Sequence, residues 1–351
     1  MKLLTLIFLF LTTVCIKANE RFILNSCPQL TPSPFLNVHL TSEDNNKATC
    51  ATAKKFADVL SRVHLFIKGH EKLFLTIFYR YTTANYEDGG LIRIPERMIK
   101  RDIETGKEFE KNFKSTLITF AHEYGHSILA SRLKQDLKEY NMFKIEAEKI
   151  FSLDKKMSML MENVGILTIE LSQAKVSGDI VKEKEIFKMM SLLGVEFKDL
   201  KKKKDKYKVE FENSENTKTI ISITTPYHEL FGDIIAALYS NDPRAMYKAQ
   251  FFAGMSEKEE KRALMRDFTE KHEVDKWAVE EPHGLFAPTR YYLWKNYWPL
   301  DLTNEQKRNF VEKLYESIQK ELISRFKNLK KRDPREINLS LMKSLSESFG
   351  K

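Results

Sequence analysis

The chain has 351 residues, of which 42% are hydrophobic and 11% aromatic, a composition typical of a globular protein with a sizeable core. Its net charge of +9 arises from 58 basic and 49 acidic residues of interspersed sign. This mixture, with no nucleic-acid-binding motif, argues against a dedicated DNA or RNA protein, although it permits attraction to anionic envelope polymers or membrane surfaces.

The first residues are typical of an export signal. Lys2 precedes a short apolar run over residues 3–16, whose length fits the apolar core of a signal peptide. We expect cleavage after Ala18 and a mature protein that is periplasmic or extracellular; a retained membrane anchor or a lipid on Cys15 is the alternative. No later apolar run is long enough to cross a bilayer, so we expect no integral membrane span after signal removal.

Removal of the signal leaves two cysteines, Cys27 and Cys50. In an exported chain they can form one disulfide, which would pin an irregular, proline-containing segment over residues 25–46. Two free thiols are the alternative. Neither cysteine stands near another Cys or a His at the spacing of a metal site.

The next residues predict a helix followed by strands. Apolar residues recur at helical spacing over residues 51–68, which indicates a core helix. Residues 73–81 are rich in β-forming residues, and a turn at residues 88–90 leads to a returning strand over residues 91–94, ended by Pro95.

A helix predicted over residues 107–135 carries the sequence His-Glu-Tyr-Gly-His at positions 122–126. Because His122 and His126 are four residues apart, they project from one helix face at a separation that one zinc ion can span. Glu123 stands beside the first histidine, where a carboxylate can take a proton from a water at the metal without occupying a coordination position. This is the His-Glu-x-x-His signature of zinc-dependent metallopeptidases. A buried helix with two hydrogen-bonded core histidines is the alternative.

Zinc needs a third protein ligand from elsewhere in the chain. A histidine shortly after the motif is ruled out, because Leu129 and Arg132 stand where that pattern has glycine and histidine. The other common arrangement is a glutamate on a separate helix, with an aspartate one turn later that orients a ligating histidine. Glu229 and Asp233 fit it as the only acids of an apolar stretch, where an unpaired carboxylate is costly. An amphipathic helix with solvated acids is the alternative.

In these two motifs the chain resembles the gluzincin group of zinc metallopeptidases, the thermolysin-like and neprilysin-like class. The resemblance covers only two short segments, whose separation is long for such enzymes. It implies one zinc ion held by His122, His126 and Glu229. It further implies Glu123 as general base and Asp233 as the hydrogen-bond partner of a ligating histidine.

The resemblance leaves the third ligand and the substrate strand open. Glu146, Glu148 and Glu162, on predicted helices of the intervening segment, are the rivals of Glu229. In proteins of this class an edge strand beside the zinc helix pairs with extended substrate, so residues 91–94 are our candidate. A strand inside the sheet is the equal alternative.

Between the two motifs the amino-acid composition of the chain changes. Residues 136–205 are dominated by Lys, Glu, Met and Leu, with apolar residues at three- and four-residue steps, which predicts an antiparallel pair of long helices broken near Gly178. This insertion is a candidate for shading the cleft or docking a protein partner, or it only extends the scaffold. Residues 207–211 and 219–223 are predicted to form a small hairpin before the helix of Glu229, which residues 241–243 end.

The segment after the second motif contains residue types that can stabilise an oxyanion. His283 is the first candidate for this hydrogen-bond donor, with Tyr291 and Arg290 behind it. A loop leading into an aromatic-rich core helix is the alternative. Residues 303–349 predict two amphipathic helices.

The sequence thus predicts an α+β, predominantly α protein: a zincin-like catalytic core with a small sheet, a long helical insertion and a helical C-terminal subdomain. We assign residues 1–18 to the signal peptide, 19–135 to an α+β subdomain with the zinc helix, 136–205 to the insertion and 206–351 to the mainly helical subdomain with the third ligand. The expected function is hydrolysis of peptide or protein substrates by an exported zinc metallopeptidase.

Two other functions are alternatives. One is a zinc-stabilised, non-catalytic binding or scaffold protein of the cell envelope, which Glu123 argues against because a structural site does not need that carboxylate. The other is a zinc amidase acting on cell-wall peptides.

Overall fold

The computed structural model describes residues 35–41, 50–69, 73–81, 84–87, 90–102, 104–299, 302–328 and 332–350. The predicted signal peptide and Cys27 lie outside these ranges, so export and the disulfide to Cys50 stay predictions. Within these ranges, no helix combines the length and the apolar character needed to cross a bilayer.

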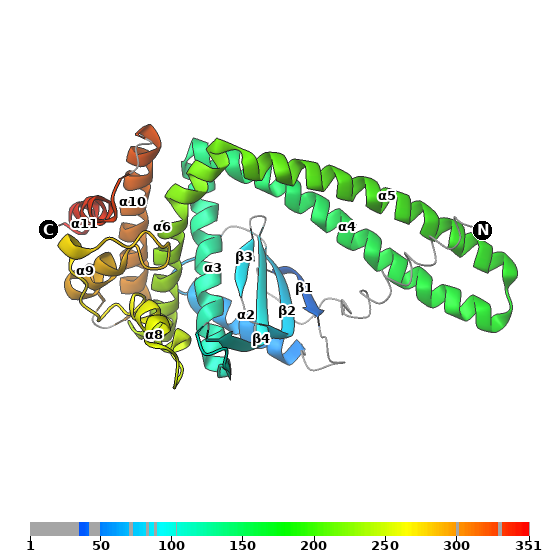
Figure 1. The fold of residues 1–351 in the computed structure, drawn as a ribbon, viewed down its shortest axis with the longest axis horizontal. Coiled ribbons are helices and arrows are strands. Elements are labelled where there is room, and N and C mark those ends of the chain that lie inside the picture. Colours follow the sequence, from blue (N-terminus) through cyan, green and yellow to red (C-terminus); the bar gives the residue numbers. More distant parts are fainter. Residues whose placement is uncertain are drawn as a thin grey trace. The chain divides into compact units, whose positions relative to one another are not determined.

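The chain is mostly helical with one small mixed sheet, which confirms an α+β fold that is predominantly α (Figure 1). It forms two compact units. The first joins the residues up to Leu137 with Ser222–Lys351, and the second is Lys138–Ile221.

The sheet belongs to the first unit. Its strands are β1 (Phe35–Thr41), β2 (Leu73–Tyr81), β3 (Asn85–Glu87), β4 (Leu91–Arg101) and β5 (Glu108–Glu110). The order is β1, β2, β4, β3: the first three are parallel, and β3 and β5 pair antiparallel with β4. Strand β2 begins with Leu73, Phe74 and Leu75, all buried, as expected for a central strand covered on both faces.

Strand β4 does not end at Pro95, as the sequence predicted, but continues to Arg101. At Pro95 it pairs with β2 alone, because β3 faces residues 91–93 and β5 faces residues 99–101. A residue without an N–H is tolerated at such an unpaired edge. The prediction of an edge strand is also wrong for residues 91–93, which lie between β2 and β3.

Helix α3 is the centre of the first unit. Every residue from 120 to 130 is buried, because the helix packs against β4 and β3 of the sheet and against helices α2, α7 and α10 (Figure 1). The helices of this unit are α2 (Cys50–His64), α3 (Phe113–Asp136), the greater part of α6 (Glu215–Ser240), α7 (Ala245–Gln250), α8 (Glu257–Leu264), α9 (Ala287–Tyr297), α10 (Asn304–Lys327) and α11 (Pro334–Phe349), with a 3-10 turn at Val274–Lys276. Charged and polar residues in so buried a helix have to find partners inside the protein.

Helix α3 starts later than predicted. Residues 108–110 form β5, and Asn112 caps the helix by accepting a hydrogen bond from the Ser115 N–H at 2.9 Å. A side-chain acceptor at this position satisfies one of the free N–H groups of the first turn.

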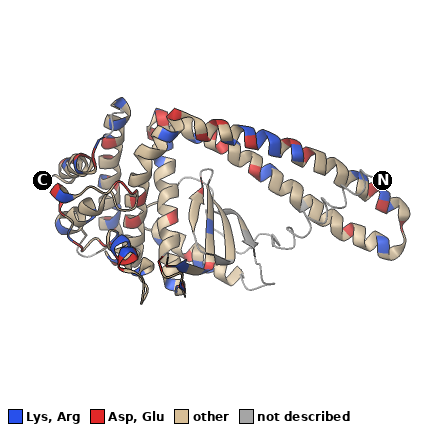
Figure 2. Cartoon of the chain, in the orientation of Figure 1, with Lys and Arg blue, Asp and Glu red and all other residues tan. Residues whose placement is uncertain are grey.

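The second unit is a helical hairpin of α4 (Lys138–Ser177) and α5 (Ile180–Asn213). The predicted break is confirmed: Gly178 takes a positive φ of 71°, and Asp179 caps α5. Residues of both charge signs stand along α5, which is therefore a solvated helix of mixed sign (Figure 2). Docking of a partner on this hairpin stays a prediction.

The strands predicted at residues 207–211 and 219–223 are wrong, and the hairpin therefore extends beyond the predicted end at residue 205. Both segments are helical, in α5 and α6. Ile220, Ile223 and Tyr227 are buried at three- and four-residue spacing, a helical period that overrides the β-branched composition.

Candidate metal centre

Helices α3 and α6 cross at two glycines. A Cβ atom on Gly125 would lie 2.7 Å from Gly232 Cα, and a Cβ on Gly232 would lie 2.6 Å from His122 Nδ1. The two backbones come so close only because neither position carries a side chain. This crossing places the His-Glu-Tyr-Gly-His motif directly against Glu229 and Asp233.

The glycine crossing predicts a large penalty for Gly232→Ala. Because the added methyl would overlap the His122 ring and backbone, we expect a loss of about 1–3 kcal/mol in the free energy of unfolding, measured by urea denaturation. Gly165→Ala and Gly194→Ala are matched controls, since both lie in helices with no atom within 4 Å of the added methyl. The controls should stabilise the protein by up to about 1 kcal/mol, and an equal penalty in all three variants would contradict the close crossing.

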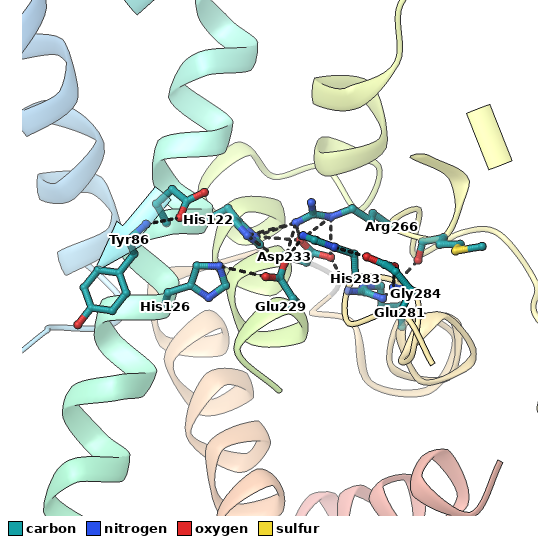
Figure 3. Close-up of polar contacts among 12 residues, drawn as sticks. Tyr86, His122, His126, Glu229, Asp233, Arg266, Glu281, His283 and Gly284 are labelled. Atoms are coloured by element: carbon teal, nitrogen blue, oxygen red, sulfur yellow. Dashed lines mark hydrogen bonds and ion pairs between the residues drawn. The ribbon is translucent and has the colours of Figure 1, made fainter. Parts of the chain in front are cut away.

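The candidate ligands gather in this crossing (Figure 3). His122 Nε2 lies 3.3 Å from Glu229 Oε2, and His126 Nε2 lies 3.7 Å from Glu229 Oε1. Ligand atoms of His122, Glu123 and His126 lie within 4.8 Å of one another, and all three residues are buried. The structure therefore brings together a buried His–Glu–His group that can hold a metal ion, with Glu229 facing both histidines. The rivals Glu146, Glu148 and Glu162 belong to α4 of the second unit.

Asp233 orients the first histidine. Its Oδ1 lies 3.0 Å from His122 Nδ1, so that this nitrogen donates and the opposite Nε2 is presented to Glu229. Asp233 is fully buried and also meets two arginines: Arg266 Nε lies 3.1 Å from Oδ1, and Arg290 Nη2 lies 2.6 Å from Oδ2. One carboxylate thus holds a histidine and two buried guanidinium groups in place.

The charges of the site shift four pKa values. Burial and Arg266 lower the pKa of His122, but its hydrogen bonds to Asp233 and Glu229 raise it to about 9. Burial and the charge of His122 hold the pKa of His126 well below its usual value. Burial raises the pKa of Glu229, yet the two histidines bring it well below the ordinary range. Burial raises the pKa of Glu123 above its ordinary value.

These donors fit a metal ion. Imidazole nitrogens with a carboxylate are a donor set that zinc accepts. In the chain alone, His126 Nδ1 is buried without a hydrogen-bond partner among the described residues, and the positive charge that faces Glu229 comes from the His122 imidazolium and from Arg266, whose Nη2 lies 3.6 Å from Glu229 Oε2. A divalent cation would supply that charge and leave His122 neutral. Arg266 competes with a metal ion at His122, because its Nη2 lies 3.2 Å from His122 Nε2. For a metal ion to bind there, this guanidinium group has to move away from His122 and keep only its contact with Asp233.

A pocket of about 340 Å³ opens onto these residues. Besides the ligands, its lining includes Tyr86 and Lys100 from the sheet, Gln250 from α7, Arg266 and His283. The Tyr86 N–H of β3 donates to Glu123 Oε2 at 2.8 Å, so the edge strand holds the carboxylate beside the histidines.

Of the three predicted oxyanion donors, the structure places only His283 at the pocket. His283 reaches the pocket, with Nε2 3.3 Å from Glu229 Oε2, a hydrogen bond from its other side to Glu281, and 49% of its side chain exposed. Arg290 instead lies fully buried against Asp233, and Tyr291 packs beside Trp294.

Sequence reasoning missed Tyr86, Lys100 and Arg266. Only Arg266 left a signal: it follows the apolar residues 263–265, and an arginine in an apolar stretch is buried only when it is paired. The other two join the site through the topology of the sheet.

Comparison with known proteins identifies no relative. No protein-family model, no curated protein and no solved structure matches the chain. The functional argument therefore depends on the site alone.

Proposed function

We propose that the protein is an exported, single-zinc metallopeptidase of the gluzincin type, with a zincin-like core in its first unit. The observation that carries this proposal is the convergence of His122, His126 and Glu229 on one buried point, with Glu123 beside them at the wall of a pocket. A structural zinc site needs neither a pocket nor a further carboxylate beside its ligands.

The three ligands would hold the ion through the imidazole rings of His122 and His126 and the Glu229 carboxylate. Bound zinc supplies a Lewis acid that polarises the scissile carbonyl and the attacking water. Glu123 accepts the proton of that water and passes it to the leaving amine, a role that its raised pKa favours. The Tyr86 N–H fixes one oxygen of Glu123 and thereby orients the other.

The remaining roles follow from the pocket walls. His283 is placed to donate a hydrogen bond to the oxyanion, because its ring faces the ligand group and is half exposed to the substrate side. Strand β3 replaces residues 91–94 as the candidate strand for extended substrate, since it is the edge of the described sheet that reaches Glu123.

The proposal predicts metal-dependent cleavage. Purified protein incubated with a mixed peptide library should produce new termini, detected by mass spectrometry. Cleavage should stop when a chelator removes zinc and return when zinc is restored. Cleavage that continues in metal-free protein would contradict the proposal, as would its complete absence from the zinc-loaded protein.

A further inference from the structure

Lys100 is a positively charged residue at the pocket wall that the proposed mechanism does not use. Lys100 lies on β4 and lines the pocket together with Met98, two residues earlier on the same face of the strand. Arg101, the next residue, is exposed on the opposite face. The strand therefore directs the Lys100 side chain to the pocket rather than to bulk solvent.

Lys100 differs from the other cations around the site in lacking a partner. Arg266 and Arg290 bind Asp233, and Lys111 donates to the Ala249 carbonyl. Among the described residues, nothing lies within hydrogen-bond or ion-pair distance of Lys100 Nζ. Burial and the charge of Arg266 lower the pKa of Lys100, whereas the charges of Glu259 and Glu123, beyond ion-pair distance, raise it.

The neighbours of Lys100 place it beside the reacting groups. Thr119, which also lines the pocket, precedes Glu123 by one helical turn of α3. Gln250 of α7 lines the same pocket and lies 3.5 Å from Lys111 Nζ, and Lys111 is close enough to Lys100 for the two charges to interact. Glu123 and Glu259 are near enough for their charges to act on Lys100 but do not form an ion pair with it, and the Tyr86 N–H holds one oxygen of Glu123. Lys100 therefore faces the pocket without a direct ion-pair partner, and a carboxylate of the substrate can supply one.

We propose that Lys100 binds a carboxylate of the peptide substrate and makes the enzyme selective for peptides with a negative charge close to the scissile bond. This inference rests on the proposed peptidase function. The carboxylate belongs either to an Asp or Glu side chain or to the free C-terminus of the peptide, because an ammonium group recognises both alike.

Two pairs of peptides test the proposal and separate the two sources. One pair differs by Glu against Gln next to the cleaved bond, and the other by a free C-terminal carboxylate against an amide. Zinc-loaded wild type should favour the carboxylate member of one pair by about 10- to 100-fold in kcat/KM. This ratio should fall to about one in Lys100→Met and recover in Lys100→Arg.

Arg101→Met is the matched control, since it removes a positive charge from the same strand on its outer face and should keep the wild-type ratio. A second readout needs no hydrolysis: calorimetry of the same peptides with zinc-loaded Glu123→Gln, with and without Lys100→Met. Carboxylate-dependent binding should disappear with Lys100.

Ratios near one for both pairs in an active wild type would overturn the inference and leave the peptidase function intact. A preference that persists in Lys100→Met would also overturn it. If the wild type cleaves no peptide, the proposed function fails and the cleavage selectivity fails with it. Calorimetry then decides the carboxylate site alone: binding that depends on the carboxylate and on Lys100 supports that site, and its absence overturns it.

Discussion

Glu123→Gln is expected to reduce peptide hydrolysis by about 10²- to 10⁴-fold while the metal stays bound. Glutamine keeps the shape of the side chain and can still accept the Tyr86 hydrogen bond, but it cannot take a proton from water. The His122, His126 and Glu229 side chains are unchanged, so the zinc content should equal that of the wild type. The measurement is kcat/KM on a cleaved peptide, with zinc determined on the same sample.

Glu321→Gln is the control for this substitution. Glu321 is also buried, but it accepts hydrogen bonds from Ser340 and Ser344 in the helical C-terminal part and does not line the pocket at the candidate metal centre. It should keep wild-type activity. Full activity in Glu123→Gln would remove this carboxylate from the mechanism and contradict its role as general base.

Asp233→Asn is expected to destabilise the fold by about 3–5 kcal/mol, because it leaves two buried guanidinium groups without their negative partner. The loss should appear as a lower free energy of unfolding in urea. Asp267→Asn is the matched control: Asp267 is buried too, but its partner Arg244 has 44% of its side chain exposed, so the loss should be clearly smaller.

The Asp233 cluster also has a defined pH dependence. Burial raises the pKa of Asp233, but Arg266 and Arg290 bring it below the ordinary value of 3.8. The stabilisation is therefore fully present above about pH 4 and is lost as the pH falls towards the folded-state pKa. Equal stability losses in the Asp233 and Asp267 variants, or a difference that does not shrink in acid, would contradict the assignment.

The motif residues could be predicted because their geometry is local. The four-residue step of a helix places His122 beside His126, and the same step places Glu229 near Asp233 on the second helix. The meeting of the two helices could not be predicted, since it depends on Gly125 facing Gly232 across a crossing that no spacing in the sequence records.

The residues that complete the pocket were out of reach for a related reason. Tyr86 contributes a backbone N–H, which every residue type except proline would offer, and Lys100 looks like an ordinary strand lysine until β4 is placed beside α3. The start of α3 was within reach, because Asn112 three residues before Ser115 is a recognisable cap.

The central claim is that His122, His126 and Glu229 hold one zinc ion, and metal content tests it most directly. Elemental analysis should compare purified wild type with His126→Ala, Glu229→Ala and Glu123→Gln after reconstitution. We predict one zinc per chain in the wild type and in Glu123→Gln, and its loss in the other two variants. A wild type that binds no zinc, or a Glu229→Ala variant that keeps it, would contradict this ligand set.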